Sequence, residues 1–147
     1  MKPLNSMTLK FESRSVNESF ARTAVAAFLL SLDPTVEEIT DIKTAVSEAV
    51  TNAIVHGYEN TIGTVYISCQ IFPDGRVTIK IKDNGKGIAD VSQAMEPLFT
   101  TGGEERSGLG FTVMQSVMDK LSVKSKLGGP TTVKLERRIV RKSAGNM

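Results

Sequence analysis

Apolar residues that alternate with polar ones predict strands in three segments of the first 81 residues. The pattern begins at residues 7–11 and returns at 65–71 and 77–81, where every second residue is apolar. This alternation is typical of strands that bury one face. Between the last two segments, Pro73-Asp74-Gly75 has the composition of a tight turn. We therefore expect a β-hairpin in the middle of the chain and a separate strand near its N-terminus.

Apolar residues at helical spacing predict two helices between the first strand and the hairpin. The first opens with Ser15-Val-Asn-Glu18, the spacing of a capping box. Its expected core face contains Phe20, Ala24, Phe28 and Leu32, widened by Val25 and Leu29. The second opens with another capping box, Thr35-Val-Glu-Glu38, and extends to about Val55. Gly57 then stands where a helix C-cap is expected.

The last third of the chain predicts a helix and two strands. The helix begins near Gly108, and its expected core face contains Phe111, Met114, Met118 and Leu121. Two strand-like runs follow around Val123 and Val133. Together the elements predict an α/β (α+β) two-layer sandwich, in which helices cover one face of a mixed, mostly antiparallel sheet. We expect a single domain over residues 1–136 and a basic, flexible tail at 137–147.

The composition is that of a globular protein with little net charge. The 147 residues include 18 basic and 16 acidic side chains, and four of the basic ones lie in the tail, which has no acid. The rest of the chain is therefore slightly acidic, which argues against nucleic-acid binding. Cys69 is the only cysteine, so no internal disulfide is expected. No apolar run approaches the roughly 20 residues of a membrane span, and no secretory signal precedes the domain, so we expect a cytoplasmic protein.

Two polar features interrupt the predicted core. Glu48, Asn52 and His56 are spaced four residues apart, so they line one stripe of the second helix beside its apolar face. Asp83 continues the inward-facing positions of the strand at 77–81, where a carboxylate without a donor is expensive to bury. A solvated helix face and a strand-ending turn are the ordinary explanations. A ligand site is the alternative.

Two glycine-rich segments strengthen the case for a ligand. The turn DNGKG at 83–87 permits positive φ and close approach of a bound molecule. The segment RSGLGF at 106–111 opens the third helix, where free N–H groups, the helix dipole and an arginine favour phosphate. Each alone also fits a plain turn or a hinge. In combination they predict ATP, with its adenine amino group on Asp83 and Mg²⁺ on the carboxamide oxygen of Asn52.

These segments resemble the nucleotide-binding boxes of the GHKL family, which includes gyrase, histidine kinases and MutL and has the Bergerat fold. EAVTNAIVHG at 48–57 is similar to the N box, DNGKG to the G1 box and GLGF at 108–111 to the G2 box. Their order agrees with the family, and the resemblance covers essentially the whole chain. Residues 47–58 and 97–101 most resemble the small anti-sigma serine kinases of spore-forming bacteria.

The resemblance implies a homodimeric, ATP-dependent protein serine kinase. Such a protein binds and inhibits a sporulation sigma factor and phosphorylates a serine of an anti-anti-sigma factor. The implied catalytic residues are Glu48, which accepts the serine proton, and Arg106, which contacts the γ-phosphate. Asn52 is the implied Mg²⁺ ligand, and Thr132 supports Asp83. The implied nucleotide contacts are Asn52, His56, Asp83, Gly85, Gly87, Thr100, Thr101, Ser107, Gly108, Leu109, Gly110, Phe111 and Thr132.

Other roles fit parts of the same pattern. Arg22 is the implied partner contact, although a solvated helix charge explains it equally. A histidine autokinase is disfavoured because His56 is the only histidine and lies inside the N box. Gyrase-like and chaperone-like ATPases couple hydrolysis to large further domains, which these residues do not include. A nucleotide-gated sigma-binding module without kinase activity stays open, since Glu48 alone separates it from a kinase.

Overall fold

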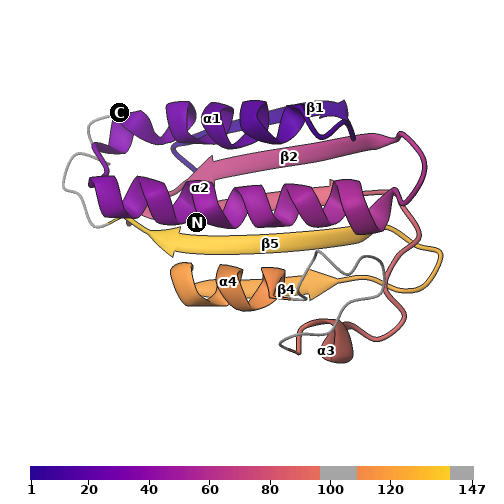
Figure 1. The fold of residues 1–147 in the computed structure, drawn as a ribbon. Helices are drawn as coiled ribbons and strands as arrows, with labels where there is room; N and C mark the ends of the chain where they lie inside the picture. Colours follow the sequence, from indigo (N-terminus) through magenta and orange to yellow (C-terminus); the bar gives the residue numbers. More distant parts are fainter. Residues whose placement is uncertain (97–108, 140–147) are drawn as a thin grey trace.

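Five strands form one open sheet, and the helices lie over one of its faces (Figure 1). The computed structural model describes residues 1–96 and 109–139. Its elements are β1 (Asn5–Glu12), α1 (Asn17–Leu29), a 3-10 turn (Leu30–Leu32), α2 (Val36–Asn52), a π-helical turn (Ala53–Gly57), β2 (Thr64–Ile71), β3 (Arg76–Asp83), α3 (Val91–Ala94), α4 (Gly110–Val117), β4 (Lys120–Lys124) and β5 (Thr131–Arg138). The strand order is β1-β2-β3-β5-β4, so β3 and β5 are interior strands.

The two-layer sandwich predicted from the sequence is confirmed. Every pair of neighbouring strands is antiparallel, so over the described residues the sheet is wholly antiparallel rather than mixed. The core lies between the layers, where α2 sits between α1 and α4 (Figure 1). Val65, Ile79 and Leu135 face it and are fully buried, each contributing about 2 kcal/mol of hydrophobic free energy. None of the described helices is long and apolar enough to cross a bilayer.

Helix α1 buries part of the face that we predicted. Its N-cap is Val16, without a side-chain cap, so the capping box expected at Ser15 is wrong. Ala21, Val25 and Leu29 are fully buried. Phe20, by contrast, is 52% exposed, and its ring meets another phenylalanine edge-on. Val25, Leu29 and Leu32 are therefore buried as predicted. The prediction is wrong at Phe20, because Ala21, one residue or about 100° further round the helix, faces the core in its place.

Helix α2 begins as predicted and ends differently. The hydroxyl of Thr35 accepts a hydrogen bond from the N–H of Glu38 (3.0 Å), and the Glu38 carboxylate accepts one from the N–H of Thr35 (2.8 Å), which confirms the capping box. After Asn52 the chain continues in a π-helical turn, closed by the bond from Tyr58 N–H to the Ala53 carbonyl. The helix therefore does not finish in a left-handed glycine cap. Gly57 instead lies against the carboxylate of Asp83.

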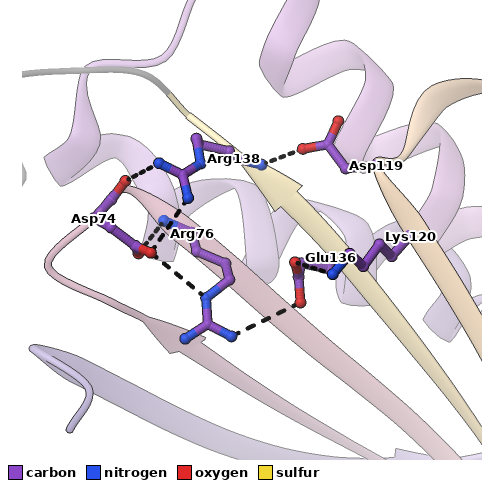
Figure 2. Close-up of polar contacts among 6 residues, drawn as sticks. All are labelled: Asp74, Arg76, Asp119, Lys120, Glu136 and Arg138. Atoms are coloured by element: carbon purple, nitrogen blue, oxygen red, sulfur yellow. Dashed lines mark hydrogen bonds and ion pairs between the residues drawn. The ribbon is translucent and has the colours of Figure 1, made fainter. Parts of the chain in front are cut away.

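The C-terminal boundary of the domain also lies later than predicted. Strand β5 includes Arg137 and Arg138, and the next residue, Ile139, is fully buried. Arg137 donates to the Asp41 carboxylate at 2.7 Å. At Arg138, the backbone N–H donates to Asp119, and the guanidinium lies against Asp74 (Figure 2). These arginines are therefore anchored in the sheet and do not belong to a flexible tail. Residues 140–147 of that predicted tail lie outside the described residues.

The expected third helix is also shorter than predicted. Helix α4 ends at Val117, and Met118, which follows it, is buried as expected. Leu121 instead belongs to β4 and is only half-buried. The chain turns into the strand at this point because Met118 already has an extended backbone.

The capping box gives a direct test of the α2 boundary. Replacing Thr35 by Ala should lower the free energy of unfolding by about 1 kcal/mol, because one N–H of the first turn loses its acceptor. Urea denaturation measures the change. Thr40→Ala is the matched control, since Thr40 is exposed within the same helix and alanine has the higher helix propensity there. Equal losses in the two variants would contradict the capping role of Thr35.

Candidate functional site

A cleft of about 570 Å³ opens on the helix side of the sheet. It lies where the end of α2, the end of β3, the start of β5, the start of α4 and the segment 86–94 meet. Its lining residues are Glu48, Ala49, Asn52, Ala53, His56, Gly57, Ile81, Asp83, Lys86, Gly87, Ile88, Ala89, Asp90, Gln93, Ala94, Leu109, Gly110, Phe111, Val113, Leu127, Thr131 and Val133. Most are apolar, with a few polar groups among them, which is the usual composition of a small-molecule site.

Asp83 is the buried polar group of this cleft. It is the last residue of β3 and is only 4% exposed. One carboxylate oxygen accepts a hydrogen bond of 2.9 Å from the N–H of Gly85. Burial raises the pKa of the Asp83 carboxyl above its ordinary value of 3.8, and the bond from Gly85 opposes that rise. A buried carboxyl with unused acceptor capacity at a cleft wall is suited to receive an N–H donor from a ligand.

Gly57 is required by the close approach of this carboxylate. A Cβ at Gly57 would lie 2.7 Å from Oδ1 of Asp83, closer than Cβ atoms normally approach, so the buried carboxylate would have to shift. The Gly57 carbonyl accepts a bond of 2.9 Å from the N–H of Lys86. Gly85 packs so closely on that same carbonyl that a side chain there would collide with it. The π-helical turn thus places Gly57 directly against the turn at 83–87. Position 57 therefore needs a glycine because there is no space for a side chain, and not because of a left-handed φ.

Several residues that the sequence did not single out hold this arrangement together. Tyr58 is buried, and its hydroxyl donates to the Thr64 carbonyl (2.6 Å) and accepts from the N–H of Asn84 (2.7 Å). On the other side, the hydroxyls of Ser125 and Thr131 are 2.6 Å apart, and Ser125 accepts from the N–H of Ile88. The tyrosine directly after the N-box glycine was the one feature of the sequence that could have pointed to these residues. Nothing in the sequence marked Ser125, because its bond to the N–H of Ile88 joins residues that are 37 positions apart.

The threonine beside Asp83 is Thr131, so the assignment to Thr132 is corrected. Asp83 pairs with Thr131 in the register of β3 and β5, and Thr131 is buried and lines the cleft. Thr132 pairs with Lys82 and is not among the lining residues. Successive residues of a strand point to opposite faces, so a shift of one residue moves the hydroxyl to the other side of the sheet.

The stripe predicted on the second helix does face the cleft. Glu48, Asn52 and His56 all line it, although the last belongs to the π-helical turn. Gly110, the first residue of α4, lies against two of them. A Cβ there would be 3.2 Å from Nδ2 of Asn52 and 3.3 Å from Oε1 of Glu48. A glycine at this position therefore lets the start of α4 approach the polar stripe of α2.

Asn52 fits a magnesium ion that arrives with a nucleotide. The described residues include no cluster of three or more His, Cys, Asp or Glu side chains that could hold a metal unaided. Mg²⁺ keeps several waters and is usually held by one or two protein oxygens together with phosphates. The carboxamide of Asn52 lies in the cleft beside the glycine start of α4, which is consistent with that mode of binding.

The remaining predicted site residues fall into three groups. Leu109, Gly110, Phe111 and Gly87 line the cleft, and Gly87 has a φ of +78° with its Cα against the Lys126 carbonyl. Gly85 lines the neighbouring hollow of about 340 Å³ and supports Asp83 from behind. The predicted contacts Thr100, Thr101, Arg106, Ser107 and Gly108 lie outside the described residues.

Arg22 lies apart from this site. It belongs to α1, is not among the residues that line the cleft, and pairs with Glu18 at 3.5 Å. Its side chain is 42% exposed, so the pairing leaves the guanidinium accessible from solvent. Arg22 therefore takes no part in forming the cleft.

The raised pKa of Asp83 predicts a specific pH dependence of stability. Because the folded state binds this proton more tightly than the unfolded chain does, the contribution of Asp83 to stability falls as pH rises above about 3.8. Asp83→Asn removes that titration. In urea denaturation, the variant should therefore gain stability relative to the native protein as pH increases from 4 towards 7. A difference that stays constant over this range would contradict the burial of the charge.

Comparisons with known proteins agree with this geometry. The family model described as histidine kinase-like ATPase domain matches residues 11–136. The anti-sigma F factor of Caldanaerobacter subterraneus subsp. tengcongensis is 60% identical over 138 residues, 93% of this chain and 96% of that protein. That of Thermoanaerobacter sp. is 58% identical over 140 residues, 95% of this chain and 97% of that protein.

A solved structure supports the fold. The structure of the RsbU and RsbW domains of Rv1364c from Mycobacterium tuberculosis matches with a TM-score of 0.69 and 20% identity. The match covers 95% of this chain and 33% of that one, so it concerns one part of a longer protein. The family model and the two relatives together show that the chain belongs to the histidine kinase-like ATPase domains and, among them, to the family of the anti-sigma F factors.

Proposed function

We propose that this protein is an anti-sigma factor that binds and inhibits a sporulation sigma factor and uses Mg-ATP to phosphorylate a serine on its anti-anti-sigma partner. The observation that carries the nucleotide part is the buried carboxylate of Asp83 at the wall of a largely apolar cleft. The sigma-directed part is supported by the names of relatives at about 60% identity over nearly the whole chain.

The adenine end of the proposed site is formed by Asp83 and the apolar residues around it. The Asp83 carboxylate accepts a hydrogen bond from the exocyclic amino group of adenine. Ala53, Ile81, Ile88 and Val133 line the same cleft and exclude water from the flat face of the base. An acceptor in a dry site discriminates strongly against a ligand that lacks the matching donor.

The phosphate end is formed by the start of α4 and the polar stripe of α2. The first backbone N–H groups of α4, which begins at Gly110, have no acceptor within the helix, and the helix dipole favours an anion there. Asn52 holds Mg²⁺ through its carboxamide oxygen, and the ion, when bound, neutralises the phosphate charge that builds up during transfer. Arg106 is proposed to contact the γ-phosphate.

Glu48 is the proposed base. It lies one helical turn before Asn52 and lines the same cleft, so a serine hydroxyl that approaches the γ-phosphate comes within reach of its carboxylate. The hydroxyl oxygen forms the new bond to phosphorus as the bond to the β-phosphate oxygen breaks, and Glu48 takes the hydroxyl proton. Phosphoryl transfer depends mainly on such positioning, so one small domain suffices.

Three further assignments belong to the proposal. The protein acts as a homodimer, it works in the cytoplasm, and Arg22 contacts a protein partner. The exposed guanidinium of Arg22 on α1 supports the last of these.

Asp83→Asn should abolish ATP binding, measured by isothermal titration calorimetry at neutral pH. The substitution puts an amide N–H₂ where the adenine amino group needs an acceptor. Asp90→Asn is the matched control, because Asp90 also lines the cleft and its replacement removes the same charge. Asparagine is also a good N-cap, so the variant should keep the N-cap of α3. Unchanged ATP affinity in Asp83→Asn would rule out the adenine assignment.

Glu48→Gln should retain ATP binding and lose transfer by a factor of about 10² or more, as expected when a general base is removed. The measurement is the intact mass of the protein and of a purified anti-anti-sigma factor after incubation with Mg-ATP. A phosphate-sized gain should occur on the partner alone. Glu37→Gln, at an exposed position of the same helix, should leave the gain unchanged.

Two outcomes of this experiment separate the proposal from its alternative. Full transfer by Glu48→Gln would remove Glu48 from the mechanism. No transfer by the native protein, with ATP still bound, would leave a nucleotide-gated sigma-binding module without kinase activity, or the wrong anti-anti-sigma partner.

A further inference from the structure

The outer face of the sheet carries an unneutralised group of lysines. In the register of the strands, two adjacent rows cross this face. One contains Lys10, Tyr66, Lys82, Thr132 and Lys124, and the other contains Thr8, Ser68, Lys80, Lys134 and Ser122. These ten positions therefore hold five lysines and no acidic residue. The helices lie on the opposite face (Figure 1), so within the described residues nothing covers the rows.

The contrast with the neighbouring end of the same face is informative. There, Arg76 lies near Asp74 and Glu136, Lys120 lies near Glu136, and Arg138 pairs with Asp74 (Figure 2). Every basic side chain in that network has a carboxylate partner. None of the five lysines in the two rows forms an ion pair with a described residue.

Protection of sheet edges does not explain these charges. Lysines on edge strands prevent unwanted strand pairing, and that reason covers Lys10 on β1 and Lys124 on β4. Lys80, Lys82 and Lys134 instead lie on β3 and β5, which are interior strands. Lys80 and Lys134 are directly opposite each other, an arrangement that destabilises a sheet when both carry the same charge.

We propose that this lysine face, defined by Lys10, Lys80, Lys82, Lys124 and Lys134, is a docking surface for an acidic segment of a partner protein. Lysines two residues apart on one strand are separated by about 6.5 Å, and neighbouring strands by about 4.8 Å. A segment that presents a carboxylate every 6 Å or so, as Asp and Glu at i and i+4 of a helix do, matches this spacing. A second copy of the chain does not, because two such faces repel each other.

A protein partner fits the face better than a nucleic acid does. Single-stranded nucleic acids are bound by exposed aromatic rings on which bases stack. The two rows hold one aromatic residue, Tyr66, and the ammonium of Lys82 lies over its ring at 5.8 Å from the centroid. The rows contain no arginine, the side chain that best forks onto phosphate. The face also lies opposite the nucleotide cleft, so a partner docked there leaves the cleft open.

The test uses the full-length double variant Lys80→Gln/Lys134→Gln and a fluorescent poly-L-glutamate peptide as the probe. Fluorescence anisotropy at low salt should show a Kd at least about fivefold weaker than that of the native protein, because two uncompensated contacts are lost. Lys2→Gln/Lys43→Gln is the matched control. It removes the same net charge at two positions outside the two rows and should change the Kd less than twofold.

Three results would overturn the proposal. Equal weakening in both double variants would show that only net charge matters. An oligothymidylate of equal charge that binds the native protein more tightly than poly-L-glutamate would assign the face to nucleic acid. Urea denaturation provides the independent readout, since Lys80→Gln/Lys134→Gln should be at least as stable as the native protein. A loss of stability would show that the lysines serve the fold.

Discussion

The burial of the Asp83 carboxylate against the Cα of Gly57 is the contact on which the architecture of the cleft depends. Because a charged group in this position is expensive to bury, the chain packs closely around it on every side except the one that faces the cleft. The π-helical turn brings Gly57 to it, the N–H of Gly85 donates to it, and β5 places Thr131 beside it. The N–H of Gly85 offsets part of the cost of the buried charge, and under the proposed function a donor on the ligand would offset more of it.

The two faces of the sheet carry different kinds of side chain. Inward-facing residues of β3 and β5 form the core and, at one end, the cleft wall. The alternate residues of the same strands carry the lysine face. A net charge near zero, which by itself argues against any charged surface, conceals this separation. The strand register alone reveals that basic side chains gather on one side.

Much of the fold and part of the cleft could be predicted from local sequence. The strand segments, the Thr35 capping box and the inward aspartate all depend on periodicity or spacing within a few residues. The errors arose where distant parts of the chain decide the outcome. Whether Phe20 or Ala21 faces the core depends on what α1 packs against, and the choice between Thr131 and Thr132 depends on the register of β3 and β5. The role of Gly57 looked like a helix cap because only the folded structure brings Asp83 against it.

The most direct test of this account compares the binding of ATP and inosine triphosphate by calorimetry. The two nucleotides differ at the position of the exocyclic amino group, which inosine replaces with a carbonyl oxygen. If Asp83 reads the adenine, ATP should bind at least about tenfold more tightly, because the carbonyl offers the buried carboxylate a second acceptor in place of a donor. Equal affinities would contradict the central claim that this buried carboxylate recognises the base.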